Sequence, residues 1–299
     1  MRTFLFAIFL LISSVNYGQN DFLLAEKYYR DGEFKKATQL YKNLHSKNPF
    51  NTTYLKRLVN CYQETTQFKI AENLLVTSLT KNPNLVYLNV ELGTNFEKQK
   101  QSDQAKIYYD KAIKSIDKYV GMGGYIGRLF KENSLLDYAI VAYKKTMLLN
   151  PNTNYEFQIA QIYGEKGNFE KMFSAYVDLI DKNEKYLNTV QHYTSRYITD
   201  DKLNNNNILF RKALIRKLVS KPKNVWNQLL SWLFVQQKEY NKAFIQEKAL
   251  YKRNPKYIQN ILSLGYNSFN SNAFETSKNC FEFIIQNSPF ISQKITANL

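Results

Sequence analysis

The six prolines of this 299-residue chain recur at nearly constant intervals, and this spacing constrains the fold more than any other feature. The first and the last two intervals are each about 34 residues, and the two between them are about twice as long. Proline cannot continue a helix, so a helix is expected to end before each one. The chain is therefore expected to consist of repeated units of about 34 residues. The prolines are Pro49, Pro83, Pro151, Pro222, Pro255 and Pro289.

Asparagine stands before four of these prolines, at Asn48, Asn82, Asn150 and Asn254. Asparagine tolerates the left-handed conformation that often ends a helix, so we expect each to adopt it. In the first unit, one helix is expected over about residues 21–31, a turn at Gly32, and a second helix over about 33–47.

Small residues keep the same period in two registers. Two small positions in each unit let a pair of antiparallel helices approach closely. Neither helix could bury its apolar face alone, so the units must stack into one continuous core. The sequence therefore predicts an all-α fold. One register is Ala37, Ala71, Ala105, Ala139, Ala243 and Ser277, and the other is Ala25, Gly93, Gly127, Ala160, Ser231 and Gly265.

These residues resemble the tetratricopeptide repeat (TPR) family, whose repeating pattern is Trp-x2-Leu-Gly-x2-Tyr, Ala-x3-Phe, then Pro. The resemblance implies a right-handed superhelical α-solenoid of about eight stacked helix-turn-helix repeats. The first unit matches the pattern at Ala25, Tyr28, Gly32, Phe34, Ala37, Tyr41 and Pro49. The solenoid is expected over 19–299, with approximate repeats at 18–51, 52–85, 86–119, 120–152, 153–186, 187–223 (irregular), 224–257 and 258–291.

The segment 1–18 has the pattern of a secretory signal peptide. Arg2 is followed by an unbroken apolar run, Phe4 to Ile12, which is too short to span a bilayer. A polar, small-residue tail leads to an expected cleavage site near Gly18. The protein is therefore expected to be exported to the periplasm or the cell-envelope periphery. The chain also resembles exported TPR proteins of Bacteroidota-type bacteria, which share its Asn/Lys/Tyr-rich composition.

The formal charge of +16 would suggest nucleic acid as a partner, but export argues against it. Between Lys202 and Lys238 no residue is acidic, so this segment is either a basic patch that docks on anionic cell wall or membrane, or a solvated face. Before it, residues 200–207 with four consecutive asparagines are expected to form a longer exposed loop. The patch residues are Arg211, Lys212, Arg216, Lys217, Lys221 and Lys223.

Candidate catalytic and metal-binding groups are scarce. Two Cys and two His form no multi-thiolate zinc site, disulfide framework or catalytic motif. Cys61 and Cys280 are interpreted as small core residues. We predict no enzyme activity, no cofactor and no metal.

The resemblance also implies a partner-binding surface, because TPR arrays bind extended peptides along the concave face lined by the first helix of each pair. Packing within the array is the alternative role for the same side chains. Lys56 and Asn60 are similar to the family's carboxylate clamp, but Glu91 stands where the clamp needs a neutral amide, so no clamp is predicted. The candidate groove residues are Gln228, Trp232, Val235, Leu262, Tyr266 and Phe269.

The C-terminal end is expected to be open. Stable solenoids end in a polar capping helix, whereas the last full helix here is apolar. A partner, a second copy of the chain, or further repeats of a longer protein would then cover it. Its apolar residues are Phe281, Phe283, Ile284 and Ile285.

The sequence thus favours a non-enzymatic exported scaffold that holds protein partners in cell-envelope assembly or organisation. The alternative is an envelope-binding module that docks on anionic cell wall or membrane through the basic patch.

Overall fold

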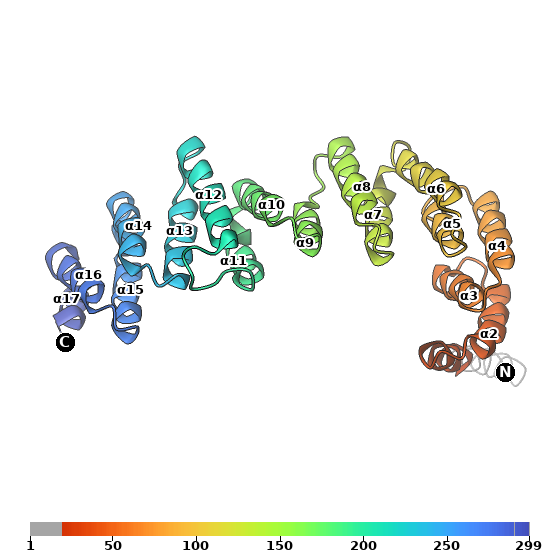
Figure 1. The fold of residues 1–299 in the computed structure, drawn as a ribbon, viewed down its shortest axis with the longest axis horizontal. Coiled ribbons are helices and arrows are strands. Elements are labelled where there is room, and N and C mark those ends of the chain that lie inside the picture. The colour runs from red at the N-terminus through yellow and green to blue at the C-terminus, as the bar shows by residue number, and fades with distance from the viewer. Residues whose placement is uncertain (1–19, 290, 299) are drawn as a thin grey trace, which may run out of the picture. The chain divides into compact units, whose positions relative to one another are not determined.

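The computed structural model describes residues 20–289 and 291–298, and within these ranges it contains helices and no strand (Figure 1). The predicted all-α repeat fold is confirmed: successive helices form antiparallel pairs, and the pairs stack. The expected signal peptide lies outside the described residues.

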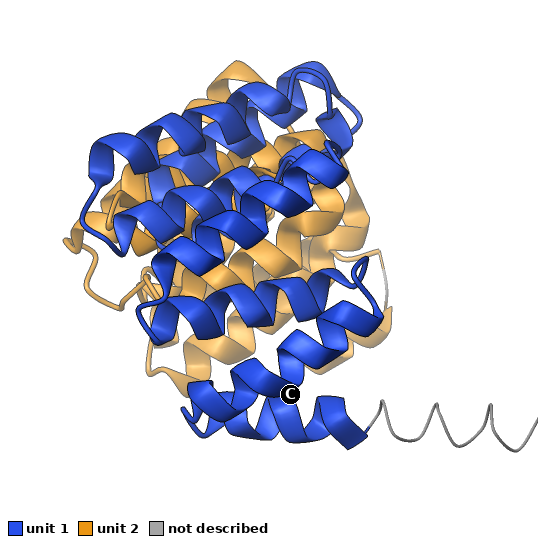
Figure 2. Cartoon of the chain, turned by 90° about the vertical axis from the view of Figure 1, so that its right-hand side faces the viewer, with its two compact units in different colours: residues 1–153 blue, residues 154–299 orange. Residues whose placement is uncertain are grey.

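The chain forms two compact units, unit 1 ending at Thr153 and unit 2 beginning at Asn154 (Figure 2). Unit 1 holds four helix pairs: residues 20–30 with α2 (Phe34–Lys47), α3 (Thr52–Glu64) with α4 (Phe68–Lys81), α5 (Leu88–Glu97) with α6 (Ser102–Ser115), and α7 (Gly123–Glu132) with α8 (Leu136–Leu149). Unit 2 holds α9 (Glu156–Glu165) with α10 (Phe169–Lys182), α11 (Leu187–Ser195) followed by α12 (Asn205–Ser220), α13 (Asn224–Gln236) with α14 (Tyr240–Arg253), α15 (Ile258–Asn270) with α16 (Phe274–Asn287), and α17 (Ile291–Asn298).

The small-residue registers lie where the helices approach most closely. Ala37, Ala71 and Ala105 are fully buried. A Cβ atom added at Gly127 would lie 2.6 Å from the Tyr143 ring, closer than packed atoms come. The small residues therefore set the distance between the helices of a pair, and large rings fill the space beside them.

In each of seven helix pairs, one residue of the turn between the two helices has the left-handed conformation. Glycine supplies it twice, at Gly32 (φ 76°) and Gly167 (φ 70°). In the other five pairs a residue with a side chain adopts it, which costs about 1 to 2 kcal/mol relative to the right-handed form. These are Thr66, Lys100, Ser134, Lys238 and Asn272.

The expectation of left-handed asparagines before the prolines is wrong. Asn82, Asn150 and Asn254 are extended, with φ of −136°, −134° and −152°. A following proline drives the preceding residue into this region. Each side-chain oxygen accepts a hydrogen bond from the backbone N–H two residues ahead, at 3.0 to 3.2 Å. The asparagines therefore shape the turn between pairs and do not act as left-handed caps.

The sixth pair differs from the prediction as well. Asn204 caps α12, so the run of asparagines enters the helix and the loop ends earlier than expected. Asn207 is fully buried, and its amide donates to the backbone oxygens of Thr199 (2.8 Å) and Asp201 (2.7 Å). The longer loop is therefore tied to α12 by a buried side chain. In turn, α12 packs mainly against α10 and α13.

Replacing Lys100 with glycine should stabilise unit 1. Lys100 is exposed and left-handed, so glycine removes about 1 to 2 kcal/mol of strain and adds about 0.5 to 1 kcal/mol of entropy cost. We expect urea denaturation to show a gain of about 0.5 kcal/mol. Gly167→Ala, where no atom is close enough to clash, should lose about 1 kcal/mol. An equal gain in Lys100→Ala, which keeps the strain, would contradict this explanation.

The two thiols should report on the two units separately. Cys61 in unit 1 and Cys280 in unit 2 are fully buried, and burial raises the pKa of their thiols to about 11 and about 12. Neither should react with Ellman's reagent at pH 8 in the native protein. In a urea titration, the Cys61→Ala variant should follow opening of unit 2 only, and Cys280→Ala that of unit 1. Rapid labelling without denaturant would show the prediction to be wrong.

Candidate functional site

The predicted groove residues divide into two groups in unit 2. On α13, Trp232 and Val235 are half-buried against the core, with the Trp232 ring 6.4 Å from that of Phe210. The Gln228 amide donates to the Tyr257 hydroxyl at 3.3 Å. Most of the surface of these side chains is therefore buried in contacts within the array.

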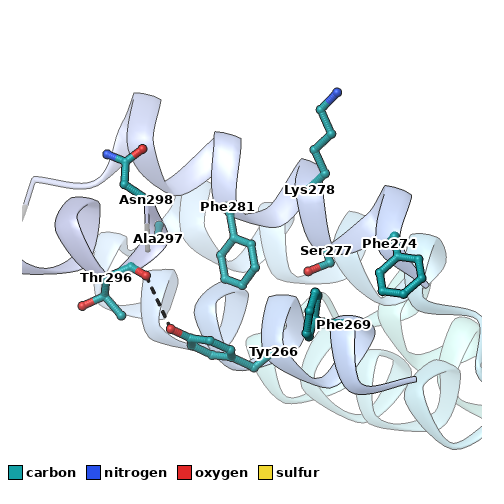
Figure 3. A pocket seen from close by; sticks show the side chains of 9 residues that line it. All are labelled: Tyr266, Phe269, Phe274, Ser277, Lys278, Phe281, Thr296, Ala297 and Asn298. Carbon is teal, nitrogen blue, oxygen red and sulfur yellow. Dashed lines mark hydrogen bonds between the residues drawn. The ribbon is translucent and has the colours of Figure 1, made fainter. Parts of the chain in front are cut away.

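On α15, the outer part of the predicted groove is open to solvent. Leu262 is buried, whereas Tyr266 and Phe269 are 44% and 55% exposed. Both line a hollow of about 420 Å³ between α15, α16 and α17 (Figure 3). The other lining residues are Phe274, Ser277, Lys278, Phe281, Thr296, Ala297 and Asn298.

Aromatic pairs form the walls of this hollow. Tyr266 meets Phe281 with ring centroids 5.2 Å apart, and Phe269 meets Phe274 at 5.6 Å, both edge to face. Gly265 allows the close approach, since a Cβ atom there would lie 2.9 Å from the Phe281 ring. The rings are held by packing and stay partly uncovered, which suits them to contact an apolar side chain.

The hollow includes residues that the sequence analysis did not place in the groove. Phe274 begins α16 and is 57% exposed, while Thr296 receives a hydrogen bond of 3.4 Å from the Tyr266 hydroxyl on its backbone oxygen. Phe274 is the first residue of the second helix in its pair, as Phe34, Phe68 and Phe169 are in theirs, and this recurring position predicts packing within the pair. The residues of α17 that line the hollow do not match the repeat pattern, so the pattern could not predict them.

The apolar residues assigned to the open C-terminal end point mostly inward. Ile284 is fully buried and Ile285 half-buried. The Phe283 ring meets Phe244 and Tyr251 of α14 at 5.9 and 5.3 Å. Packing of α17 against α16 covers part of this end, so the uncovered apolar surface shifts to the aromatic hollow and to Ile291.

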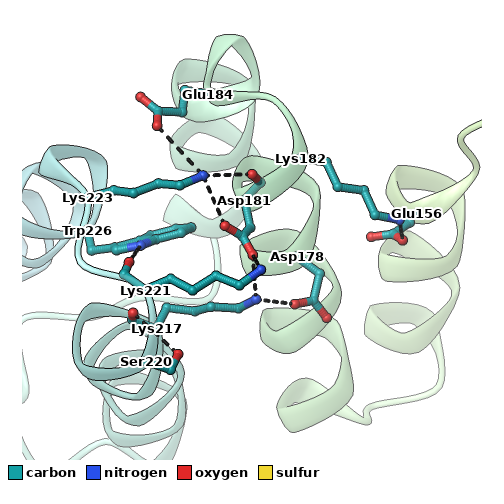
Figure 4. Close-up of polar contacts among 10 residues, drawn as sticks. All are labelled: Glu156, Asp178, Asp181, Lys182, Glu184, Lys217, Ser220, Lys221, Lys223 and Trp226. Carbon is teal, nitrogen blue, oxygen red and sulfur yellow. Dashed lines mark hydrogen bonds and ion pairs between the residues drawn. The ribbon is translucent and has the colours of Figure 1, made fainter.

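The basic segment is neutralised in part by acids that lie elsewhere in the sequence (Figure 4). Asp181 of α10 accepts from Lys217 at 2.9 Å, from Lys221 at 3.1 Å and from Lys223 at 3.0 Å. Arg211 lies 3.7 Å from Glu239. Four of the six patch cations therefore have an acidic partner, while Lys212 and Arg216 are exposed.

The three lysines hold Asp181 in its charged form. Its side chain is 9% exposed. Hydrogen bonds from Lys217, then from Lys223 and Lys221, outweigh desolvation and lower the pKa of Asp181 well below its usual range. Lys217 also lies 2.8 Å from Asp178. This cluster joins α10 to α12, so these cations stabilise the array.

Within the described residues, no group of three or more His, Cys, Asp or Glu side chains has the arrangement of a metal site. No described helix is long and apolar enough to cross a membrane.

Several solved structures are similar to this chain, and TPR proteins are among them. The C-terminal part of a TPR repeat-containing protein from Cytophaga hutchinsonii is 15% identical, with 92% of this chain and 98% of that chain covered and a TM-score of 0.33. A TPR protein from Thermus thermophilus is 17% identical, with 60% and 97% covered and a TM-score of 0.35. PilF from Pseudomonas aeruginosa is 13% identical, with 71% and 96% covered and a TM-score of 0.33.

No protein-family model and no curated protein matches the chain. The fold assignment therefore rests on the helix pairs described above, and the relation to the TPR family is a resemblance.

Replacing Asp181 with asparagine should destabilise unit 2. Because the folded pKa is depressed, the ionised group contributes stability above the unfolded pKa of about 3.9, and this contribution is lost as the pH falls through the folded pKa. Asp181→Asn should cost about 1 kcal/mol at pH 7 after screening of the exposed lysines, and the difference from wild type should shrink below about pH 4. Urea denaturation followed by circular dichroism measures both.

Asp178→Asn is the matched control. Asp178 is 47% exposed and pairs with one of the three lysines, so its replacement should cost less. A loss in the control as large as that in Asp181→Asn would refute the assigned role of Asp181.

Proposed function

We propose that this protein is a non-enzymatic scaffold that binds protein partners in the assembly or organisation of the cell envelope. The observation that carries this proposal is the aromatic hollow between α15, α16 and α17, where Tyr266, Phe269 and Phe274 stay exposed. Such a surface suits an extended partner segment that inserts an apolar side chain.

The sequence pattern of a signal peptide supports the envelope part of the proposal. Residues 1–18 have the charge, apolar run and polar tail of a signal peptide. In this proposal the mature protein begins near Gln19 and resides in the periplasm or at the envelope periphery.

The alternative of docking on an anionic surface receives less support. Lys217, Lys221 and Lys223 would first have to leave Asp181. Only Lys212 and Arg216 of the patch would then be available to an anionic membrane. Each cation contributes a binding free energy of about 1 kcal/mol near such a surface, which for two cations is too little for stable binding.

Photo-crosslinking in the source cells tests the proposal. Benzoylphenylalanine placed at Phe269 should crosslink to one defined envelope protein. The same probe placed at Phe274 should crosslink to the same protein, and adding Phe269→Glu to that second variant should abolish the crosslink. The control position is Ile245 of α14, which is 58% exposed and outside the hollow. Mass spectrometry of the mature N-terminus should find Gln19.

Two results would overturn the proposal. One is the same set of crosslinked products from positions 269 and 245, which would show contact by chance. The other is a protein that retains Met1 and fractionates with the cytoplasm, which would remove the envelope role.

A further inference from the structure

The outer side of α12 exposes a row of apolar side chains. Ile208, Ile215 and Val219 are 38%, 46% and 77% exposed. Together with the exposed Lys212 they follow one another at intervals of four, three and four residues. Residues at this spacing lie along one face of a helix, here over about 16 Å. These four residues are called the outer stripe of α12.

The opposite side of α12 fixes this helix in the array. Phe210 and Leu214 are fully buried. Lys217 donates to Asp181 of α10 at 2.9 Å (Figure 4). Because α12 is anchored through this side, the outer stripe is formed before any partner arrives, and a preformed surface loses less conformational entropy on binding.

The composition of the outer stripe suits contact with another helix. A surface helix usually buries one apolar face and turns polar residues outward, whereas α12 carries apolar residues on both sides. Isoleucine and valine are stiff at χ1 in a helix, so little rotamer freedom is lost when a second helix packs against them. Alternating intervals of four and three residues are also the spacing by which paired helices interlock.

The charge of the outer stripe indicates which kind of helix would pack there. Residues 205–220 include no acid. Lys212 lies within the stripe and Arg216 lies beside it, both are exposed, and neither forms an ion pair with another described residue. A helix with acidic side chains next to its own apolar row would supply the missing negative charges.

Two other occupants fit this surface less well. In a symmetric pair of two copies the same patch meets itself, which would bring the cations of one α12 close to those of the other. A helix that lies on a membrane surface typically uses Trp, Phe or Leu on its apolar side, and the outer stripe has none of these. Charge and side-chain type therefore both favour an acidic protein helix.

We propose that the outer stripe of α12 binds an amphipathic helix of a partner protein, in which acidic residues flank the apolar row. Ile208, Ile215 and Val219 pack against that row and provide most of the binding free energy. Lys212 and Arg216 pair with the flanking acids and select an acidic helix over a basic one.

This inference rests on the proposed scaffold function, since it names the chemistry of a partner and gives it a second surface. The outer stripe belongs to α12, whereas the aromatic hollow lies between α15, α16 and α17. Its test uses a synthetic helix and variants of α12, so its failure would leave the crosslinks at Phe269 and Phe274 unaffected.

The test measures fluorescence anisotropy of a labelled synthetic helix with the purified protein. The helix has about three heptads, with Ile and Leu at the a and d positions and Glu at the e and g positions. A comparison peptide has Lys at the e and g positions. The Glu peptide should bind about fivefold more tightly than the Lys peptide, or better.

Reversing the charges of the stripe should reverse this preference. Lys212→Glu combined with Arg216→Glu should weaken binding of the Glu peptide about tenfold and strengthen binding of the Lys peptide. A gain for the Lys peptide cannot arise from misfolding. Lys106→Glu combined with Lys114→Glu is the matched control, because both lysines are exposed on α6 and the overall charge changes equally.

The apolar contribution has its own variant. Ile215→Ser should weaken binding of the Glu peptide about fivefold, since an exposed apolar side chain is lost from the middle of the stripe. Val141→Ser is the matched control: Val141 lies on α8 and is 47% exposed, close to the value for Ile215. It should bind the Glu peptide as wild type does.

Four results would overturn the proposal. Equal effects of the α12 and α6 charge reversals would indicate general attraction to a basic protein. Equal effects of Ile215→Ser and Val141→Ser would remove the stripe as the contact. Attachment to phosphatidylglycerol vesicles in place of the Glu peptide would assign the stripe to a membrane. A dimer that Ile215→Ser dissociates would assign it to a second copy of the chain.

Discussion

Close contact between the two helices of each pair is the constraint on which the rest of this structure depends. It requires a small side chain at fixed positions, as Ala37 and Gly127 show, and a ring such as Tyr143 beside it. Because these positions recur once in each repeat, the same packing is repeated along the chain. The faces that point away from these contacts are free to differ between repeats, and the candidate sites lie on them.

The two units use those faces differently. In unit 1 the first helices carry a network of charged and polar groups, such as Arg57 with Glu26 and Gln63 with Asn95. In unit 2 the hollow beside Tyr266 is aromatic, and the charges gather around Asp181 between α10 and α12. One repeat architecture therefore presents two surfaces of different chemistry.

The sequence predicted what the period controls, and it failed where contacts join distant residues. Proline spacing and the positions of small residues were sufficient to predict the helix pairs. The acid-free run from Lys202 to Lys238 did not reveal that Asp181, on an earlier helix, forms ion pairs with three of its lysines. Asn207 likewise resembled a loop residue, because its burial depends on how the preceding segment folds back. The Asn60 amide donates to the Tyr29 hydroxyl and the Gln63 amide to Asn95, and no linear pattern contains these contacts.

The irregular sixth pair also affects cooperativity. A stack of repeats behaves as a one-dimensional chain of coupled elements, in which the weakest coupling decides where the native state first opens. The short helix α11 buries only Val190 and Thr194, and its successor packs mainly on α10 and α13. Thermal fluctuations should therefore release α11 ahead of its neighbours, while α12 holds the stack together. Amide hydrogen exchange would then be faster in this short helix than in α10, α12 and α13, and unit 2 would have an internal site of local opening.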